Sequence, residues 1–130
     1  MVSIDTNVVV RVLVNDDPAQ ARRAVALIKD NDIFIAKTVI LESEWVLRGA
    51  YKLDRGRVNT ALRAFLSLDR LLIEDEEAVF SALDAHADGL DFADAMHVAS
   101  SRRAESFATF DAGLRARGRA LSLKPPVTAP

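Results

Sequence analysis

Short apolar runs alternate along the chain with longer segments in which apolar side chains recur at helical spacing. This spacing predicts helices over residues 18–31, 38–52, 54–68, 75–89, 91–103 and 112–118. The predicted N-caps include Thr38, Asp75 and Asp91. The intervening apolar runs predict strands over residues 2–4, 33–36, 71–73 and 106–110. Strands separated by helices need crossover connections, so the pattern indicates an α/β domain built on a parallel sheet.

One segment is ambiguous by periodicity. Residues 8–14 are rich in β-branched side chains, which favours a strand, yet Val8 and Val12 are also spaced as in a helix. The chain has no internal repeat and no linker. We therefore expect one three-layer α/β/α domain over residues 1–123, with a central parallel sheet of four to five strands. Residues 124–130 are expected to form an extended, loose tail.

The composition narrows the class of protein. Of the 130 residues, 50% are apolar and only 6% are aromatic, so the core must consist mainly of aliphatic side chains. The absence of cysteine excludes a disulfide scaffold, a thiolate zinc site and a cysteine nucleophile. No apolar run approaches the roughly 18 residues of a membrane-spanning helix, and the N-terminus has no basic leader. We expect a soluble, cytoplasmic domain.

Charge is balanced overall but unevenly distributed. The net charge is −2, which by itself gives no support to nucleic-acid binding. Residues 71–101 contain eight acids and no Lys or Arg, whereas residues 48–70 contain six basic residues and two acids. After Ala112 there are four basic residues and no acid. Such blocks are typical of solvated helix faces, and the alternative is a basic surface beside an acidic pocket.

Several acids lie where sites form in α/β proteins. Asp5 and Asp111 each follow a predicted strand, at the sheet edge beyond the carboxyl ends of the strands. Helix capping explains either residue equally well. Asp91 and Asp94 open a predicted helix, and capping would explain both. However, Asp94 lies off the apolar face of that helix, which would direct it toward the same crevice as Asp5.

Glu42 and Glu44 differ in their expected surroundings. Glu42 lies on an apolar stripe formed by Val39, Val46 and Ala50. Glu44 has Arg48 four residues later, which is the spacing of an ordinary exposed ion pair. We therefore expect Glu42 to be half-buried and to need a partner, and Glu44 to lie at the surface.

A cluster of such carboxylates needs a cation. Two unit charges about 5 Å apart repel by about 3 kcal/mol at an effective dielectric constant of roughly 20. Oxygen ligands without nitrogen or sulfur suit Mg²⁺ or Mn²⁺, which also bind phosphate groups. Phosphodiester hydrolysis is the chemistry that this arrangement favours.

Four segments together resemble the signature segments of PIN-domain nucleases, and more narrowly the ribonuclease toxins of VapBC-type toxin–antitoxin pairs. A single Asp-Thr-Asn would be a weak signal, but the four occur in order and at family-like spacing over nearly the whole chain. The segments are Ile4-Asp5-Thr6-Asn7, Val39–Glu42 leading into Trp45–Arg48, Asp91–Ala95, and Ala108-Thr109-Phe110-Asp111.

The resemblance implies an acidic catalytic and metal-binding site made of Asp5, Glu42, Asp94 and Asp111, with Mg²⁺ or Mn²⁺ as cofactor. Asp5 and Asp94 would be the most direct ligands. The supporting residues would be Thr6, which would orient the Asp5 carboxylate, Asn7 in the same turn, Asp91 as an accessory acid, and Thr109.

The family's fold also makes residues 8–14 a helix. The implied activity is endoribonuclease cleavage of single-stranded or looped RNA, leaving 5′-phosphate and 3′-hydroxyl ends. The implied partners are a second copy of the chain in a homodimer and an antitoxin. The C-terminal segment of that antitoxin would block the acidic groove, commonly with an arginine.

Other readings fit less well. His97 occupies a position that is more often aliphatic in the family, and we expect it to pack on its helix or to be partly exposed, with no chemical role. A phosphatase with a nucleophilic aspartate would usually have a second acid where Asn7 stands. The sequence has neither the G-x-S-x-G of a serine hydrolase nor the H-E-x-x-H of a zinc peptidase. The main alternative is a PIN-fold binding module that has lost catalysis.

Overall fold

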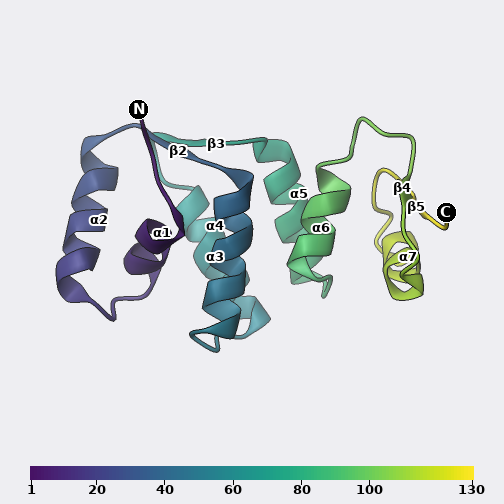
Figure 1. Cartoon of the computed structure of the whole chain (residues 1–130), viewed down its shortest axis with the longest axis horizontal. Coiled ribbons are helices and arrows are strands. Elements are labelled where there is room, and N and C mark those ends of the chain that lie inside the picture. The colour runs from purple at the N-terminus through teal and green to yellow at the C-terminus, as the bar shows by residue number, and fades with distance from the viewer. The chain divides into compact units, whose positions relative to one another are not determined.

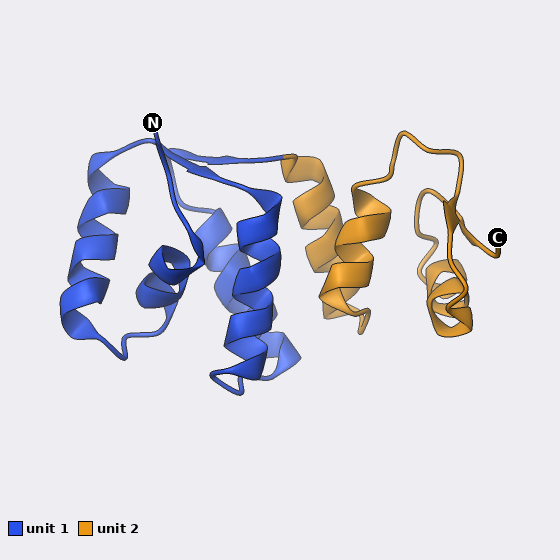
Figure 2. Cartoon of the chain, viewed as in Figure 1, with its two compact units in different colours: residues 1–74 blue, residues 75–130 orange.

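The computed structural model describes all residues from Met1 to Pro130. The chain forms two compact units, Met1–Glu74 (unit 1) and Asp75–Pro130 (unit 2), which are coloured separately in Figure 2. Every strand is paired in parallel with its neighbour, and seven helices connect the strands. The α/β class with parallel strands is therefore confirmed.

Unit 1 is built on a three-stranded parallel sheet. Its elements are β1 (Val2–Ser3), α1 (Thr6–Leu13), α2 (Pro18–Asp30), β2 (Ile33–Ile35), α3 (Lys37–Gly49), α4 (Arg55–Leu66) and β3 (Leu71–Ile73) (Figure 1). The strand order is β1-β2-β3, with Val2 opposite Ile33 and Ile33 opposite Leu71. Helix α1 packs against α2 and α3, and α3 packs against α4. Leu47 and Leu62 fill the core between these helices.

Unit 2 consists of a helix pair followed by a small sheet. Its elements are α5 (Glu76–Ala87), α6 (Phe92–Ala99), β4 (Phe107–Ala108), α7 (Ala112–Ala120) and β5 (Val127–Thr128). Helices α5 and α6 pack along each other, and α7 packs against β5 (Figure 1). Val79, Leu83 and Phe92 are among the fully buried side chains of the helix pair.

The predicted elements occur with small shifts at their ends. Residues 6–13 are helical, as the family resemblance implies and as periodicity alone did not establish. Thr38 is not an N-cap, because α3 begins at Lys37 after Ala36 and has no side-chain cap. Asp75 stands at the N-cap position of α5 but does not cap it: its backbone is left-handed, and its carboxylate pairs with Arg102 at 2.6 Å.

The C-terminal segment differs from the loose tail that the sequence suggests. Val127 and Thr128 form β5, which pairs in parallel with Phe107 and Ala108 of β4. The five strands are thus divided into a sheet of three and a sheet of two. A two-residue strand can form here because Gly118 of α7 allows Val127 to approach the helix backbone closely.

Replacing Gly118 with alanine should destabilise the protein by about 1–3 kcal/mol, although alanine is the better helix former. A Cβ at this position would lie 2.7 Å from Val127 Cγ2 and 3.0 Å from Val127 Cβ, so β5 would have to move. Gly56→Ala in α4 is the matched control, since its Cβ would meet nothing closer than 3.6 Å. We expect Gly56→Ala to be neutral or stabilising by up to about 1 kcal/mol in urea unfolding. Equal effects of the two substitutions would contradict the close packing of α7 on β5.

Candidate acidic site

Three of the predicted site acids are helix N-caps. Asp5 Oδ1 accepts a hydrogen bond from the Val8 amide at 3.2 Å. Asp91 Oδ2 accepts from the Asp94 amide, and Asp111 Oδ1 accepts from the Leu114 amide, both at 3.0 Å. Each cap uses a single carboxylate oxygen, so the other oxygen can still bind a ligand. Capping and metal binding are therefore compatible roles for these residues.

In unit 1, Thr6 connects the start of α1 to α3. Its side chain is buried, and its hydroxyl donates a short hydrogen bond to Glu42 Oε1. The hydroxyl thus orients Glu42 rather than Asp5, which corrects the role that the family resemblance implied. Asp5 itself is exposed at the end of β1, directly after the buried Ile4. Asn7 is also exposed and lines a shallow cavity between α1 and α2.

The expected burial of the two glutamates of α3 is wrong for both, although Glu42 does have a partner, Thr6. Glu42 is exposed, whereas Glu44 is buried, with 3% of its surface accessible. The core stripe of α3 runs through Ile40, Ser43, Glu44 and Leu47. Glu44 remains satisfied there because Arg48 Nε donates to Glu44 Oε2 at 2.8 Å, one helical turn away. A buried charge with such a partner can occupy a position that periodicity assigns to apolar residues.

In unit 2, Asp94 is half-buried in the first turn of α6, and its carboxylate accepts no hydrogen bond from the protein. Burial raises the pKa of this carboxyl, and the negative charges of Asp91 and Asp111 raise the pKa further. The neighbouring His97 and Arg117 oppose the increase in the pKa of Asp94. Asp94 therefore belongs to a group of acids whose charge the protein itself compensates only in part.

Two further contacts shape the surroundings of these acids. The Thr109 hydroxyl accepts a hydrogen bond from the Asp111 amide at 3.1 Å, and Arg115 donates to the Thr109 carbonyl at 2.8 Å. These bonds hold the turn between β4 and α7 on which Asp111 lies. Arg117 donates one hydrogen bond, to the Gly89 carbonyl at 3.4 Å, so its guanidinium retains donors for an anion.

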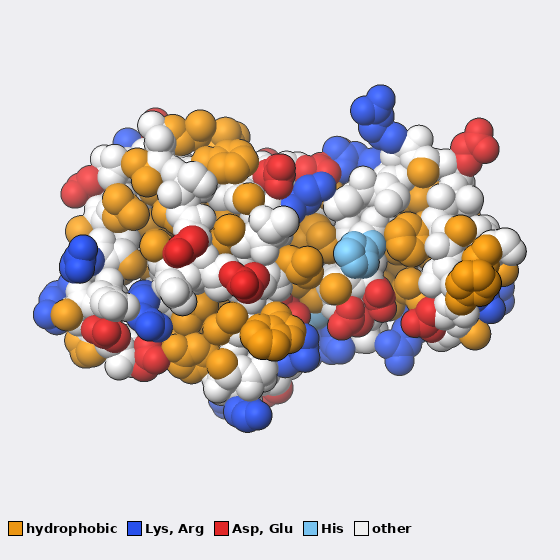
Figure 3. Space-filling view, viewed as in Figure 1, with side chains coloured by type: hydrophobic (Ala, Val, Ile, Leu, Met, Phe, Trp, Pro, Cys, Tyr) orange, Lys and Arg blue, Asp and Glu red, His pale blue; other side chains and the backbone are white.

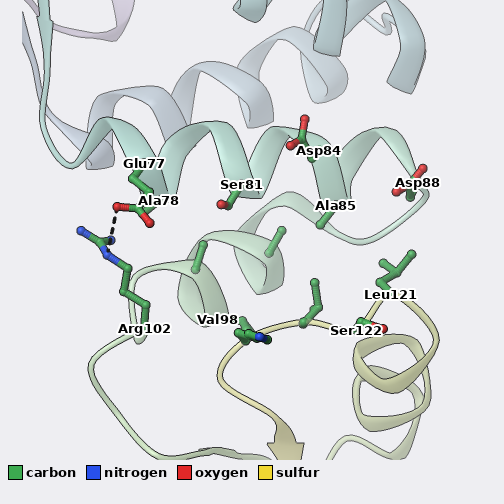
Figure 4. Close-up of a pocket in the computed structure, with 14 residues that line it drawn as sticks. Glu77, Ala78, Ser81, Asp84, Ala85, Asp88, Val98, Arg102, Leu121 and Ser122 are labelled. Atoms are coloured by element: carbon green, nitrogen blue, oxygen red, sulfur yellow. Dashed lines mark ion pairs between the residues drawn. The ribbon is translucent and has the colours of Figure 1, made fainter.

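Unit 2 also contains a cavity of about 340 Å³ between α5, α6 and residues 121–124 (Figure 4). Glu77 and Arg102 form an ion pair of 3.7 Å at its margin. Asp84 and Asp88 also line it, but none of the predicted site acids does. On the face of each unit that Figure 3 shows, acidic side chains are interspersed with hydrophobic and basic ones. The cavity is thus a separate feature from the acids of the site.

The candidate ligands suit a hard divalent cation by their chemistry. All are carboxylates, with hydroxyls and backbone amides beside them, and no cysteine is present. Such oxygen donors favour Mg²⁺ or Mn²⁺. Asp5 and Glu42 belong to unit 1, and Asp94 and Asp111 belong to unit 2. Neither unit on its own contains three acids grouped closely enough to hold a metal ion.

The PIN domain family profile matches residues 2–120, which include both units and all four acidic segments. This chain is a PIN domain. No curated protein matches it closely enough to indicate a more specific activity. PIN domains are mostly metal-dependent nucleases and typically bind divalent metal ions. No helix of this PIN domain is long and apolar enough to cross a membrane.

The raised pKa of Asp94 predicts how the stability of the metal-free protein depends on pH. Because the folded state binds the Asp94 proton more tightly than the unfolded state does, Asp94 lowers stability as the pH rises through its folded pKa. This destabilisation is absent below the pKa that Asp94 has in the unfolded state. In EDTA, Asp94→Asn should therefore raise the Tm by on the order of a few degrees at pH 7 and by less at pH 3.5. The exposed Asp69→Asn is the control, for which we expect no such difference between the two pH values.

Proposed function

We propose that this PIN domain is a metal-dependent endoribonuclease whose catalytic and metal-binding carboxylates are Asp5, Glu42, Asp94 and Asp111. The observation that carries the proposal is the environment of Asp94. Its carboxylate is half-buried, accepts no hydrogen bond and is influenced by two neighbouring acids. Keeping such a group charged lowers stability, and a bound divalent cation would remove that cost.

When bound, Mg²⁺ or Mn²⁺ supplies the positive charge that offsets the phosphodiester and lowers the pKa of a water molecule. Asp5 and Asp94 are the proposed direct ligands, because each has at least one oxygen that the protein does not use. Thr6 fixes the orientation of Glu42 through its hydroxyl. The supporting residues are Asp91, which holds the first turn of α6, Thr109, which holds the turn before Asp111, and Asn7 beside Asp5.

RNA is the proposed substrate because the four acidic segments resemble those of VapBC toxins. On the same basis we propose that the protein acts as the toxin of a pair, as a homodimer, with a cognate antitoxin that blocks the acidic site. The basic residues of 48–70 and of α7 would contact the RNA backbone. Binding should therefore weaken steeply as the salt concentration rises.

Cleavage-site mapping on total RNA tests the nuclease proposal. We expect cleavage in Mn²⁺ or Mg²⁺, new ends that carry a 5′-phosphate, and no cleavage in excess EDTA. Equal cleavage with and without EDTA would overturn metal dependence. RNA binding without cleavage in any divalent metal would instead identify the chain as a binding module that has lost catalysis.

Expression in growing cells tests the toxin proposal separately. The wild-type chain should arrest growth, whereas Asp5→Asn, expressed at the same level, should not. Cleavage in vitro without growth arrest would support the nuclease activity and would rule out the toxin role in that host.

A further inference from the structure

Trp45 is a large aromatic side chain at the surface of α3. It is the only tryptophan of the chain, and 62% of its surface is exposed. A buried aromatic ring of this kind typically removes 150–250 Å² from water, so the exposed position forgoes most of that stabilisation. The buried residues of α3, such as Ile40 and Leu47, point away from the Trp45 face. The core packing of unit 1 therefore does not account for this tryptophan.

The helical neighbours of Trp45 connect it to the acidic site. Glu42 lies one turn earlier at i−3, on the same side of α3, and its carboxylate is held by Thr6 directly after Asp5. Arg48 follows at i+3 with a half-exposed side chain whose Nε donates to the buried Glu44. Gly49 at i+4 leaves open space beside the ring, because a Cβ there would meet no atom within 4 Å. This face of α3 thus carries an acid of the proposed site, an exposed aromatic ring and a bare stretch of helix.

From this arrangement we propose that Trp45 stacks on an unpaired base of the RNA substrate next to the bond that is cleaved. The inference rests on the proposed ribonuclease function. Exposed aromatic rings are one means by which proteins hold single-stranded nucleic acid, since every base presents a π face. The substrate is the occupant that this position favours, because Glu42, one helical turn from the ring, is one of the proposed catalytic acids.

The single tryptophan provides its own spectroscopic probe. The Asp5→Asn variant, which should bind without cleaving, is titrated with a short single-stranded RNA while tryptophan emission and binding anisotropy are recorded. We expect quenching that saturates together with binding. An abasic strand of the same length should bind more weakly and quench little. If RNA binds without quenching, the stacking proposal is wrong.

Substitutions separate stacking from a structural role. In the Asp5→Asn background, Trp45→Leu should weaken RNA binding by about 5- to 150-fold, whereas Trp45→Phe should retain most of the affinity. Leu72→Ala is the control, because Leu72 is another exposed apolar residue of unit 1 and lies on β3. Circular dichroism should show the same folded spectrum for all variants, since Trp45 is exposed.

The outcomes distinguish this inference from the function on which it rests. If the wild type cleaves RNA and Trp45→Leu binds and cleaves equally well, only the stacking role is overturned. If the wild type neither binds nor cleaves RNA, both proposals are overturned. A blue shift of Trp45 emission with rising protein concentration and no RNA would show that a second copy covers the ring, which also contradicts stacking.

Discussion

Asp94→Asn is expected to reduce metal-dependent RNA cleavage by at least about 100-fold while leaving the protein folded. Changes around a metal that spare its direct ligands already cost about 10- to 100-fold, and Asp94 is proposed as a direct ligand. The amide keeps the shape of the side chain but removes the charge that attracts the cation. Asp5→Asn should have an effect of similar size. The measurement is the initial rate of cleavage of a defined RNA in Mn²⁺.

Stability provides the second readout for Asp94→Asn. In EDTA the variant should be at least as stable as the wild type, because a carboxylate with a raised pKa has been removed. Mn²⁺ should raise the Tm of the wild type and have little effect on the variant. Asp88→Asn is the matched control, since it is an exposed aspartate of the same unit, and we expect near wild-type cleavage. Loss of cleavage together with loss of folded structure would contradict a specific role for Asp94.

The sequence predicts the order of helices and strands well, because local signals define them. The N-cap roles of Asp91 and Asp111 can be predicted because each is a short acidic residue before an amphipathic segment, and the structure contains both caps.

The C-terminal residues 124–130 could not be predicted in this way. Their pairing with β4 depends on the close approach of Val127 to Gly118. Contacts between residues distant in sequence leave no local signal, so the pattern of residues 124–130 gave no indication of β5.

The two glutamates of α3 show where periodicity fails. Glu42 and Glu44 are two positions apart, so a shift of the buried stripe by part of a turn exchanges their environments. Glu44 can belong to the buried stripe because Arg48 neutralises its charge. An ion pair at i,i+4 has the same sequence pattern whether it is exposed or buried, so the sequence does not reveal this burial. Thr6 is a similar case. Its contact with Glu42 spans 36 residues, so its partner can be identified only from the fold.

The prediction with the largest effect on stability concerns Phe92. Phe92→Ala should lower the free energy of unfolding by about 3–5 kcal/mol, a large part of the 5–15 kcal/mol typical of a domain. Phe92 is 1% exposed, and its ring meets His86 edge-on with centroids 5.2 Å apart, so truncation leaves a cavity between α5 and α6. Urea unfolding followed by circular dichroism measures the loss.

Phe110→Ala is the matched control, since Phe110 is 88% exposed and its truncation should change stability by no more than about 0.5 kcal/mol.

Phe92 is also the first residue of α6, directly after the Asp91 cap and two residues before Asp94. A cavity there would loosen the turn that carries both acids, so Phe92→Ala should also reduce cleavage under conditions where the variant remains folded. If the two substitutions cost the same stability, Phe92 does not anchor the core of unit 2. If Phe92→Ala destabilises the protein but leaves cleavage unchanged, the position of Asp94 does not depend on the packing beneath it.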